Sequence, residues 1–363
     1  MSSASDTAVA AALTDSAGSS RAPVATSQAS WVRDGVLQLP APLPLHFGGR
    51  LDQVRVAWRL SGNPQGPLVV TLGGISAGRL VTDVGTDEKG WWSEVIGPDK
   101  ALDTRHYQVL GMDFLGGSGA TTGPRSGQTN FPSISAYDQA EILRRLIEHL
   151  AGPAGIARVA AIIGASYGGM VALAFAERWP RIAGHIVVIS AAERSHPLST
   201  AWRSVQREMV RYAMRHGDAP EGLRLARALA MATYRSREEF VARFSGPAAR
   251  IDGRYQFPVE SYLLARGDAY AATYVPEAFV CLSESIDLHQ VDPARIHAPV
   301  TLVGVLEDQL VPIEDLRALR ARLGGPANLV ELSSIYGHDA FLKETAALRK
   351  VFAGALQAAG EAR

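Results

Sequence analysis

Ser166, His338 and Asp308 have the residue types that nucleophilic catalysis by a serine requires. Ser166 stands in the Gly-x-Ser-x-Gly pattern of "IIGASYGGM" (162–170), and a serine hydroxyl is a weak nucleophile until a base takes its proton. His338, in "YGHDAFL", can serve as the base, and Asp308, in "LEDQLVP", can orient the imidazole. The adjacent Glu307 remains a second candidate for the acid. These residues together predict acyl chemistry at a serine triad.

The glycines around Ser166 favour a tight turn between a strand and a helix. The apolar run before Gly164 predicts the strand, and the segment after Gly168 predicts the helix. In such a turn the glycines leave room for close backbone contacts, and the N–H of Tyr167 points at a developing oxyanion near a helix N-terminus. The alternative is an ordinary Gly-rich turn that happens to contain a serine.

A second oxyanion donor is expected from a loop after an early strand. "TLGGISAGR" (71–79) follows such a strand, and the backbone N–H of Ile75 is the preferred donor. The sequence does not separate Ile75 from Gly74 for this role, and an ordinary Gly-rich turn is the alternative.

The elements that must position these residues follow an alternating pattern. Short apolar runs predict buried strands at 53–60, 67–74, 107–114, 159–166, 184–191, 299–306 and 327–334. Helical periodicity and terminal signals predict helices at 135–152, 168–180 and 313–325. Strands that alternate with helices indicate an α/β domain with a mostly parallel sheet. The chain order of serine, acid and histidine is that of the α/β-hydrolase fold.

The alternation stops between residues 194 and 290, where the sequence reads as mostly helical. We therefore predict an α/β-hydrolase core from residues 31–193 and 291–363, with 194–290 inserted as a helical cap. Residues 1–30 are rich in Ala, Ser and Thr and predict a disordered tail. They lack the basic start and continuous apolar centre of an export signal, so a cytoplasmic location is expected.

Composition excludes several classes of function. Lys+Arg and Asp+Glu both number 36, so no basic excess indicates a nucleic-acid partner. No apolar run approaches the roughly 20 residues that span a bilayer, so no membrane partner is expected. The single cysteine, Cys281, cannot form an internal disulfide. No metal cluster, phosphate loop or dinucleotide fingerprint is evident, and "LGGSGATTG" (115–123) lacks the Lys-Ser/Thr ending of a phosphate loop.

One long stretch carries a family resemblance. "GWWSEVIGPDKALDTRHYQVLGMDFLGGSGATTGPRSGQTNFPSIS" (90–135) resembles the homoserine O-acyltransferase family of α/β-hydrolase-fold enzymes. The similarity continues through "GASYGGMVALAFAERWP", "RSVQREMV", "SYL", "SIDLH" and "GHDAFL", and covers about residues 50–350. The chain departs from the family at Ala165 and Tyr167, where a glycine and a Met or Leu are usual. It also departs at "GGISA" (73–77), where the family commonly has His-Ala-Leu-Thr-Gly.

The resemblance implies a ping-pong transfer from an acyl-CoA to the hydroxyl of L-homoserine, in methionine biosynthesis. It implies that Arg207 binds the substrate carboxylate and that Asp339 receives the substrate ammonium. Without the resemblance, these two residues read as a surface arginine and a helix N-cap. Acyl-CoA would be a cosubstrate and not a bound cofactor, and the family resemblance also suggests a homodimer built through the cap.

The donor and acceptor remain open at this stage. Acetyl is the expected acyl group, with succinyl as the alternative; Arg79 could bind the distal carboxylate of a succinyl group or could face solvent. Serine is an alternative acceptor. Two rival classes also remain: a serine hydrolase with the same triad, and a non-catalytic binding protein on the same fold.

Overall fold

A computed structural model describes residues 31–152 and 159–361. The predicted tail, residues 1–30, lies outside this part of the chain. Within the described residues, eight strands form one sheet in the order β1-β4-β8-β5-β9-β10-β13-β14. Their bounds are β1 Val32–Gln38, β4 Arg55–Gly62, β8 Gln108–Met112, β5 Leu68–Leu72, β9 Val159–Ala165, β10 Ala183–Ile189, β13 Val300–Val305 and β14 Ala327–Leu332. The pairs β1–β4 and β4–β8 are antiparallel and the others parallel, which confirms the predicted fold class.

The central strands form where the apolar runs predict them, because both faces of the sheet are covered. Every residue of β9, β10 and β13 is buried. Alternate side chains reach opposite faces: Ile162 belongs to the core under α1 and α2, and Ile163 to the core under α9. The edge strand β1 was not predicted, because "VRDGVLQ" is half-exposed and carries two charges and a glycine.

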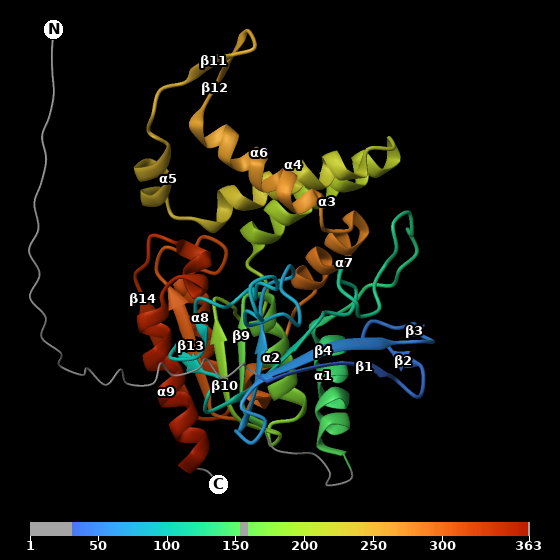
Figure 1. The fold of residues 1–363 in the computed structure, drawn as a ribbon, viewed down its shortest axis with the longest axis vertical. Coiled ribbons are helices and arrows are strands. Elements are labelled where there is room, and N and C mark those ends of the chain that lie inside the picture. The colour runs from blue at the N-terminus through green and yellow to red at the C-terminus, as the bar shows by residue number, and fades with distance from the viewer. Residues whose placement is uncertain (1–30, 153–158, 362–363) are drawn as a thin grey trace, which may run out of the picture.

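Helices cover both faces of the sheet (Figure 1). They are α1 Ala136–Ala151, α2 Tyr167–Arg178, α8 Ile313–Arg322 and α9 Thr345–Glu361. Helix α1 begins at Ser135, whose side chain accepts the N–H of Asp138 while the Asp138 carboxylate accepts the N–H of Ser135. Shorter elements are β2 Leu43–Pro44, β3 Arg50–Leu51, β6 Ile96–Gly97, β7 Leu102–Asp103 and the 3₁₀ helices Pro293–Arg295 and Gly337–Leu342.

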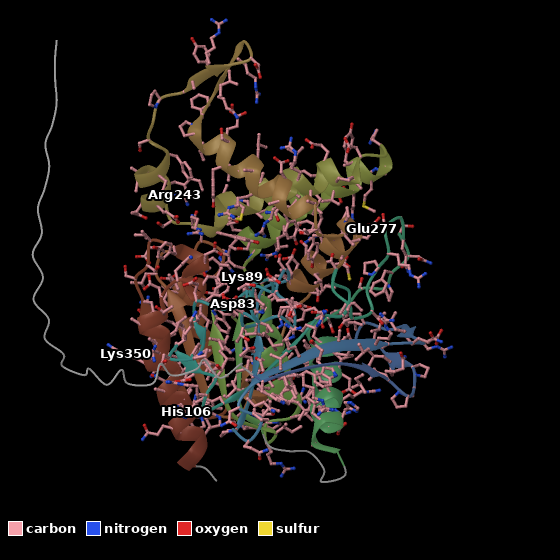
Figure 2. All side chains as sticks on the ribbon, viewed as in Figure 1. Asp83, Lys89, His106, Arg243, Glu277 and Lys350 are labelled. Atoms are coloured by element: carbon pink, nitrogen blue, oxygen red, sulfur yellow. The ribbon has the colours of Figure 1, made fainter. Side chains whose placement is uncertain are left out.

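The segment between β10 and β13 forms a separate layer above one end of the sheet (Figure 1). It contains α3 Pro197–Arg215, α4 Ala219–Tyr234, α5 Arg237–Phe244, α6 Pro258–Ala271 and α7 Pro276–Asp287, with a hairpin of β11 Ala249–Ile251 and β12 Arg254–Gln256. Arg194 and Gln290 pair as an isolated β-bridge where the segment leaves and rejoins the core. In Figure 2, Arg243 lies in this cap, whereas Lys350 lies on α9 of the core.

None of the helices in residues 31–152 and 159–361 is both long enough and apolar enough to cross a bilayer.

Candidate active site

Ser166 lies at the turn between β9 and α2, in a backbone conformation that residues other than glycine rarely adopt. Its φ is 54° and its ψ is −122°. The turn is closed so tightly that a Cβ on Gly164 would lie 2.2 Å from the carbonyl oxygen of Gly168. A Cβ on Gly168 would lie 2.3 Å from the carbonyl oxygen of Leu72. Strain of this kind persists only where surrounding structure holds it, and it is concentrated at functional sites.

The structure brings the three predicted catalytic residues into contact. Ser166 Oγ lies 2.9 Å from His338 Nε2, and His338 Nδ1 lies 2.7 Å from Asp308 Oδ2. Asp308 follows β13, and His338 lies in the 3₁₀ helix after β14, so both come from the carboxyl ends of parallel strands near β9. This is the geometry of a nucleophile, a base and a group that orients the base.

The two neighbouring acids after β13 have different partners. The second oxygen of Asp308 accepts hydrogen bonds from the N–H groups of Leu310 and Val311, at 2.8 and 3.1 Å. Glu307 instead accepts from the Ser333 hydroxyl and the Ser334 N–H, at 2.5 and 2.7 Å. The geometry therefore places Asp308, and not Glu307, against the imidazole.

The environment of His338 favours its role as a proton acceptor. Burial lowers the pKa of the imidazole, but the charge and the hydrogen bond of Asp308 outweigh burial and raise that pKa above its ordinary value. A more basic imidazole takes the proton of Ser166 more readily once it is neutral.

The turn also leaves one backbone donor free beside Ser166. The first N–H groups of a helix have no acceptor within it. In α2, the Gly168 N–H is bound to the Gly73 carbonyl at 2.8 Å, and the N–H groups of Gly169 and Met170 both reach Ser166 O, at 2.9 and 3.2 Å. Within the described residues no acceptor is recorded for the Tyr167 N–H, which is the predicted oxyanion donor.

The loop that should supply the second donor is held against this turn. The bond from Gly168 to the Gly73 carbonyl ties the loop to the start of α2. Tyr274 of the cap donates its hydroxyl hydrogen to the Ile75 carbonyl at 2.8 Å. Gly74 and Ile75 both line the same cavity as Ser166, so the choice between their N–H groups stays a prediction.

A cavity of about 220 Å³ lies between the core and the cap, and Ser166 and His338 line it. Much of its wall is aromatic, from Trp91, Trp202, Phe279 and Phe341. Arg194, Arg203 and Arg227 also line it. A mostly apolar space with a few cations is suited to hold an acyl chain and a carboxylate while limiting the access of water.

Comparison with known proteins agrees with this geometry. Residues 67–345 match the model of the alpha/beta hydrolase fold family. A homoserine O-succinyltransferase of Xanthomonas campestris pv. campestris is 39% identical over 325 residues, which cover 89% of this chain and 84% of the relative. The chain belongs to the homoserine O-acyltransferase family. The resemblance predicted from the sequence is thereby confirmed, and the protein is an acyltransferase.

Two further similarities fit this family. A serine O-succinyltransferase of Litchfieldella anticariensis is 33% identical over 353 residues, covering 85% of this chain and 94% of the relative. The crystal structure of a homoserine O-acetyltransferase from Bacillus anthracis superimposes with a TM-score of 0.80 at 20% identity, covering 90% of this chain and 97% of that one. At that identity, the structural similarity shows the fold alone.

The structure separates the two residues predicted to bind the amino acid. Asp339 lines the cavity and lies 3.0 Å from Arg235 Nε; its burial raises the pKa of its carboxyl group. Arg207 does not line the cavity. Its guanidinium lies 2.5 Å from the Asp287 carboxylate and also donates to Ser283. Its predicted contact with the substrate therefore requires Arg207 to leave these partners.

Arg79, the candidate for a distal carboxylate, lies in a similar position. Its guanidinium is 2.5 Å from Asp113 Oδ2, and it does not line the cavity. The Asp113 carboxylate also accepts the N–H groups of Arg79 and Ala120, both at 2.8 Å. The pair thus fixes the loops on which these residues lie.

Arg227 is a cavity residue that sequence reasoning missed. No carboxylate within the described residues forms an ion pair with it, and its one recorded hydrogen bond is a 3.4 Å contact with the Tyr234 hydroxyl. Its guanidinium lies over the rings of Tyr234 and Tyr270. The spacing of Arg227 and Tyr234, two turns apart on one helix face, was the available signal, but an arginine on a cap helix ordinarily faces solvent.

Among the described residues, no group of three or more His, Cys, Asp or Glu side chains is arranged to hold a metal ion. His196 lines the cavity at the start of α3, although the sequence did not distinguish it from a surface histidine.

Proposed function

We propose that the protein transfers an acyl group from an acyl-CoA to the side-chain hydroxyl of L-homoserine by a ping-pong mechanism. The observation that supports this proposal is that one cavity contains two sets of functional side chains. One is the Ser166–His338–Asp308 arrangement, and the other is Arg227, which forms no ion pair among the described residues and lies close to the buried Asp339. The first suits acyl chemistry, and the second suits an amino acid.

In the first half-reaction, Ser166 Oγ would attack the thioester carbonyl carbon while His338 takes its proton. The Tyr167 N–H and a donor at 74–75 would stabilise the tetrahedral oxyanion. When the intermediate collapses, the carbon–sulfur bond breaks and His338 gives the proton to the departing sulfur. Coenzyme A leaves as the free thiol, and Ser166 carries the acyl group as an ester.

In the second half-reaction, the same groups would act on the amino acid. His338 takes the proton of the substrate hydroxyl, and the hydroxyl oxygen attacks the ester carbonyl of the acyl-enzyme. The carbon–oxygen bond to Ser166 breaks, and His338 returns the proton to Ser166 Oγ. The product is an O-acyl amino acid, and the enzyme is regenerated without any cofactor.

Charge complementarity supports the amino-acid site. A guanidinium binds a carboxylate through two parallel hydrogen bonds, and no carboxylate in the described part of the chain forms an ion pair with Arg227. Burial disfavours the charged form of Arg227, but Tyr234, Tyr270 and Asp339 together raise its pKa. Asp339 lies next to His338 in sequence and offers a carboxylate for the substrate ammonium. The two charges of the amino acid would thus hold its hydroxyl near the base.

The cations of the cavity favour a succinyl donor over the acetyl donor expected from the sequence. Arg203 is paired with Asp287, and Arg227 is assigned to the amino-acid carboxylate. Arg194 lines the cavity and has no ion pair among the described residues. A succinyl group carries a second carboxylate that Arg194 could bind, whereas an acetyl group has none. The name of the 39% identical relative is consistent with this choice.

The test is thiol release from succinyl-CoA and acetyl-CoA, each with L-homoserine, L-serine or no acceptor. We expect release that requires both an amino acid and Ser166, with the highest kcat/KM for succinyl-CoA and L-homoserine. Release that is independent of the acceptor and yields free acid would mean a hydrolase on the same triad. Arg194→Ala should lower kcat/KM for succinyl-CoA more than for acetyl-CoA; an equal loss for both donors would contradict the assignment of Arg194.

The cap surface supports a homodimer as a further part of the proposal. Large apolar side chains are exposed on it, among them Tyr212, Tyr255 and Phe257 at 60, 68 and 56% exposure. Contact with a second copy of the chain would remove these side chains from water. Sedimentation of the protein should give twice the monomer mass, and a monomer at micromolar concentration would contradict this part.

A further inference from the structure

We propose that the Tyr167 hydroxyl acts as a positioning group: it fixes cap helix α7 over Ser166 and thereby keeps water from the acyl-enzyme. This inference rests on the proposed acyl transfer, since it concerns the choice between water and the amino acid as acceptor. Tyr167 is the residue after the nucleophile, and its side chain and its backbone N–H have separate tasks.

The Tyr167 side chain connects three parts of the molecule. Its ring is 1% exposed and packs edge-on against Phe114. Its hydroxyl lies 2.6 Å from Ser285 Oγ, on cap helix α7. It also accepts a 3.3 Å hydrogen bond from the Gln139 amide of α1, and Gln139 binds both the N–H and the carbonyl of Leu115. The nucleophile turn is thus bonded to the cap and to the Gly-rich 115–123 loop.

Helix α7 carries several groups that shape the reaction cavity. Phe279, Ser283 and Ile286 all line it. At the end of the helix, the Asp287 carboxylate holds Arg203, another lining residue, at 2.7 Å. A small displacement of α7 would therefore move both the apolar wall and a cation beside the nucleophile.

Two carboxylates of α7 bind loops of the core, since Glu277 accepts the Gly127 N–H at 2.7 Å and Glu284 accepts the Ser133 hydroxyl at 2.9 Å. Within the described residues, the Tyr167–Ser285 bond is the one that joins α7 to the nucleophile turn itself. Leu282 is fully buried and belongs to the main core, which keeps the helix attached. Apolar contacts are non-directional, however, and tolerate sliding, whereas a hydrogen bond specifies one position. Both hydroxyls are buried, since Ser285 is 0% exposed. Breaking their bond leaves a polar group without its partner, which disfavours the native position of the helix.

The consequence is kinetic, because water and the amino acid compete for the same ester of Ser166. A displaced α7 admits water, whose oxygen then attacks the acyl carbon, releasing the free acid and regenerating the Ser166 hydroxyl. The same displacement disturbs the site of the amino acid. Loss of the bond should therefore raise the ratio of free acid to O-acyl amino acid.

The experiment is a double-mutant cycle with Tyr167→Phe and Ser285→Ala in the full-length chain. Free acid and O-acyl-L-homoserine are quantified by mass spectrometry at one fixed concentration of succinyl-CoA and L-homoserine. Each single variant should raise the ratio of acid to ester about fivefold, the factor that one neutral hydrogen bond would give. The double variant should show the same ratio as Tyr167→Phe, because the bond to Ser285 is already absent from that variant; both also lose the weaker 3.3 Å contact with Gln139.

The controls keep the result interpretable. Tyr107→Phe removes a phenol hydroxyl from a partly buried side chain just before β8, at the end of the sheet opposite Ser166, and should leave the ratio as in the wild type. Ser285→Ala keeps the Tyr167 side chain and tests the same bond if Tyr167→Phe does not fold. Wild-type ratios in both single variants, or multiplied effects in the double variant, would overturn the inference. If the wild-type enzyme forms free acid alone, the proposed function fails, and this inference fails with it.

Discussion

Replacing Arg227 with alanine distinguishes the amino-acid site proposed from the cavity from the one that the family resemblance implies. The family resemblance implies that Arg207 binds the substrate carboxylate, whereas Arg227, and not Arg207, lines the cavity. Arg207→Ala is the matched variant, since both residues are arginines on neighbouring cap helices, α3 and α4. Arg227→Ala should weaken substrate binding more than folding, and Arg207→Ala should weaken folding more than substrate binding.

The magnitudes follow from the partners of each guanidinium. Hydrogen bonds to a charged group contribute about 1.5–3 kcal/mol, so Arg227→Ala should lower kcat/KM for L-homoserine roughly 10- to 150-fold. Its effect on folding should be about 1 kcal/mol, because it loses ring contacts with Tyr234 and Tyr270 and one 3.4 Å hydrogen bond, but no ion pair within the described residues. Arg207→Ala breaks a buried ion pair, but Asp287 keeps Arg203 as a partner. We expect a loss of about 1–3 kcal/mol in the free energy of unfolding.

The assay has two readouts for both variants. Steady-state kinetics with varied L-homoserine give KM and kcat/KM, and urea denaturation gives the free energy of unfolding. Arg227→Lys, which keeps the charge but not the two parallel bonds, should recover part of the activity. The reasoning is refuted if Arg207→Ala raises the KM for L-homoserine more than Arg227→Ala does while the stability of Arg207→Ala stays that of the wild type.

Three further predictions concern the triad. Gly164→Ala should abolish acyl transfer, since its Cβ would lie 2.2 Å from a backbone oxygen of the turn; a thermal melt and labelling by a serine-directed phosphonate check this, and full labelling would contradict it. Asp308→Asn should lower kcat about 10³- to 10⁴-fold, with Glu307→Gln as the near-neutral control; equal losses would reassign the acid. Because Asp308 raises the pKa of His338, kcat/KM should increase with pH through a pKa above 6.5, as the imidazole loses the proton that blocks its action as a base. A pH-rate profile whose limb lies below 6.5 would contradict the last prediction.

Much of the core was predictable because its signals are local. Each of the apolar runs proposed as a strand coincides with a strand of the sheet, since burial on both faces demands continuous apolar residues. Strand β1 was not predicted, because an edge strand needs no continuous run of apolar residues. Its Arg33 and Asp34 side chains are exposed. The β11–β12 hairpin of the cap was not predicted for a related reason, because its residues are almost all exposed.

The sequence did not indicate which arginine of the cap lines the cavity. Family resemblance selected Arg207, and no local pattern indicated that Asp287 would take its guanidinium. Arg227 lacked any signal stronger than its spacing from Tyr234. Which cap arginine faces the nucleophile depends on how α3, α4 and α7 rotate and cross, and those angles follow from packing over the whole cap.

The sequence by itself predicted a nucleophile and its base and determined the strand-helix framework that carries them. Those features depend on short patterns: glycines that a tight turn requires, apolar strands, and the order of serine, acid and histidine along the chain. Only the tertiary structure decided between Asp308 and Glu307, brought Arg227 to the cavity and joined Tyr167 to Ser285 across 118 residues. Such contacts between distant segments are set by the packing of whole elements, because the energies that select them arise only when the cap and the core are assembled.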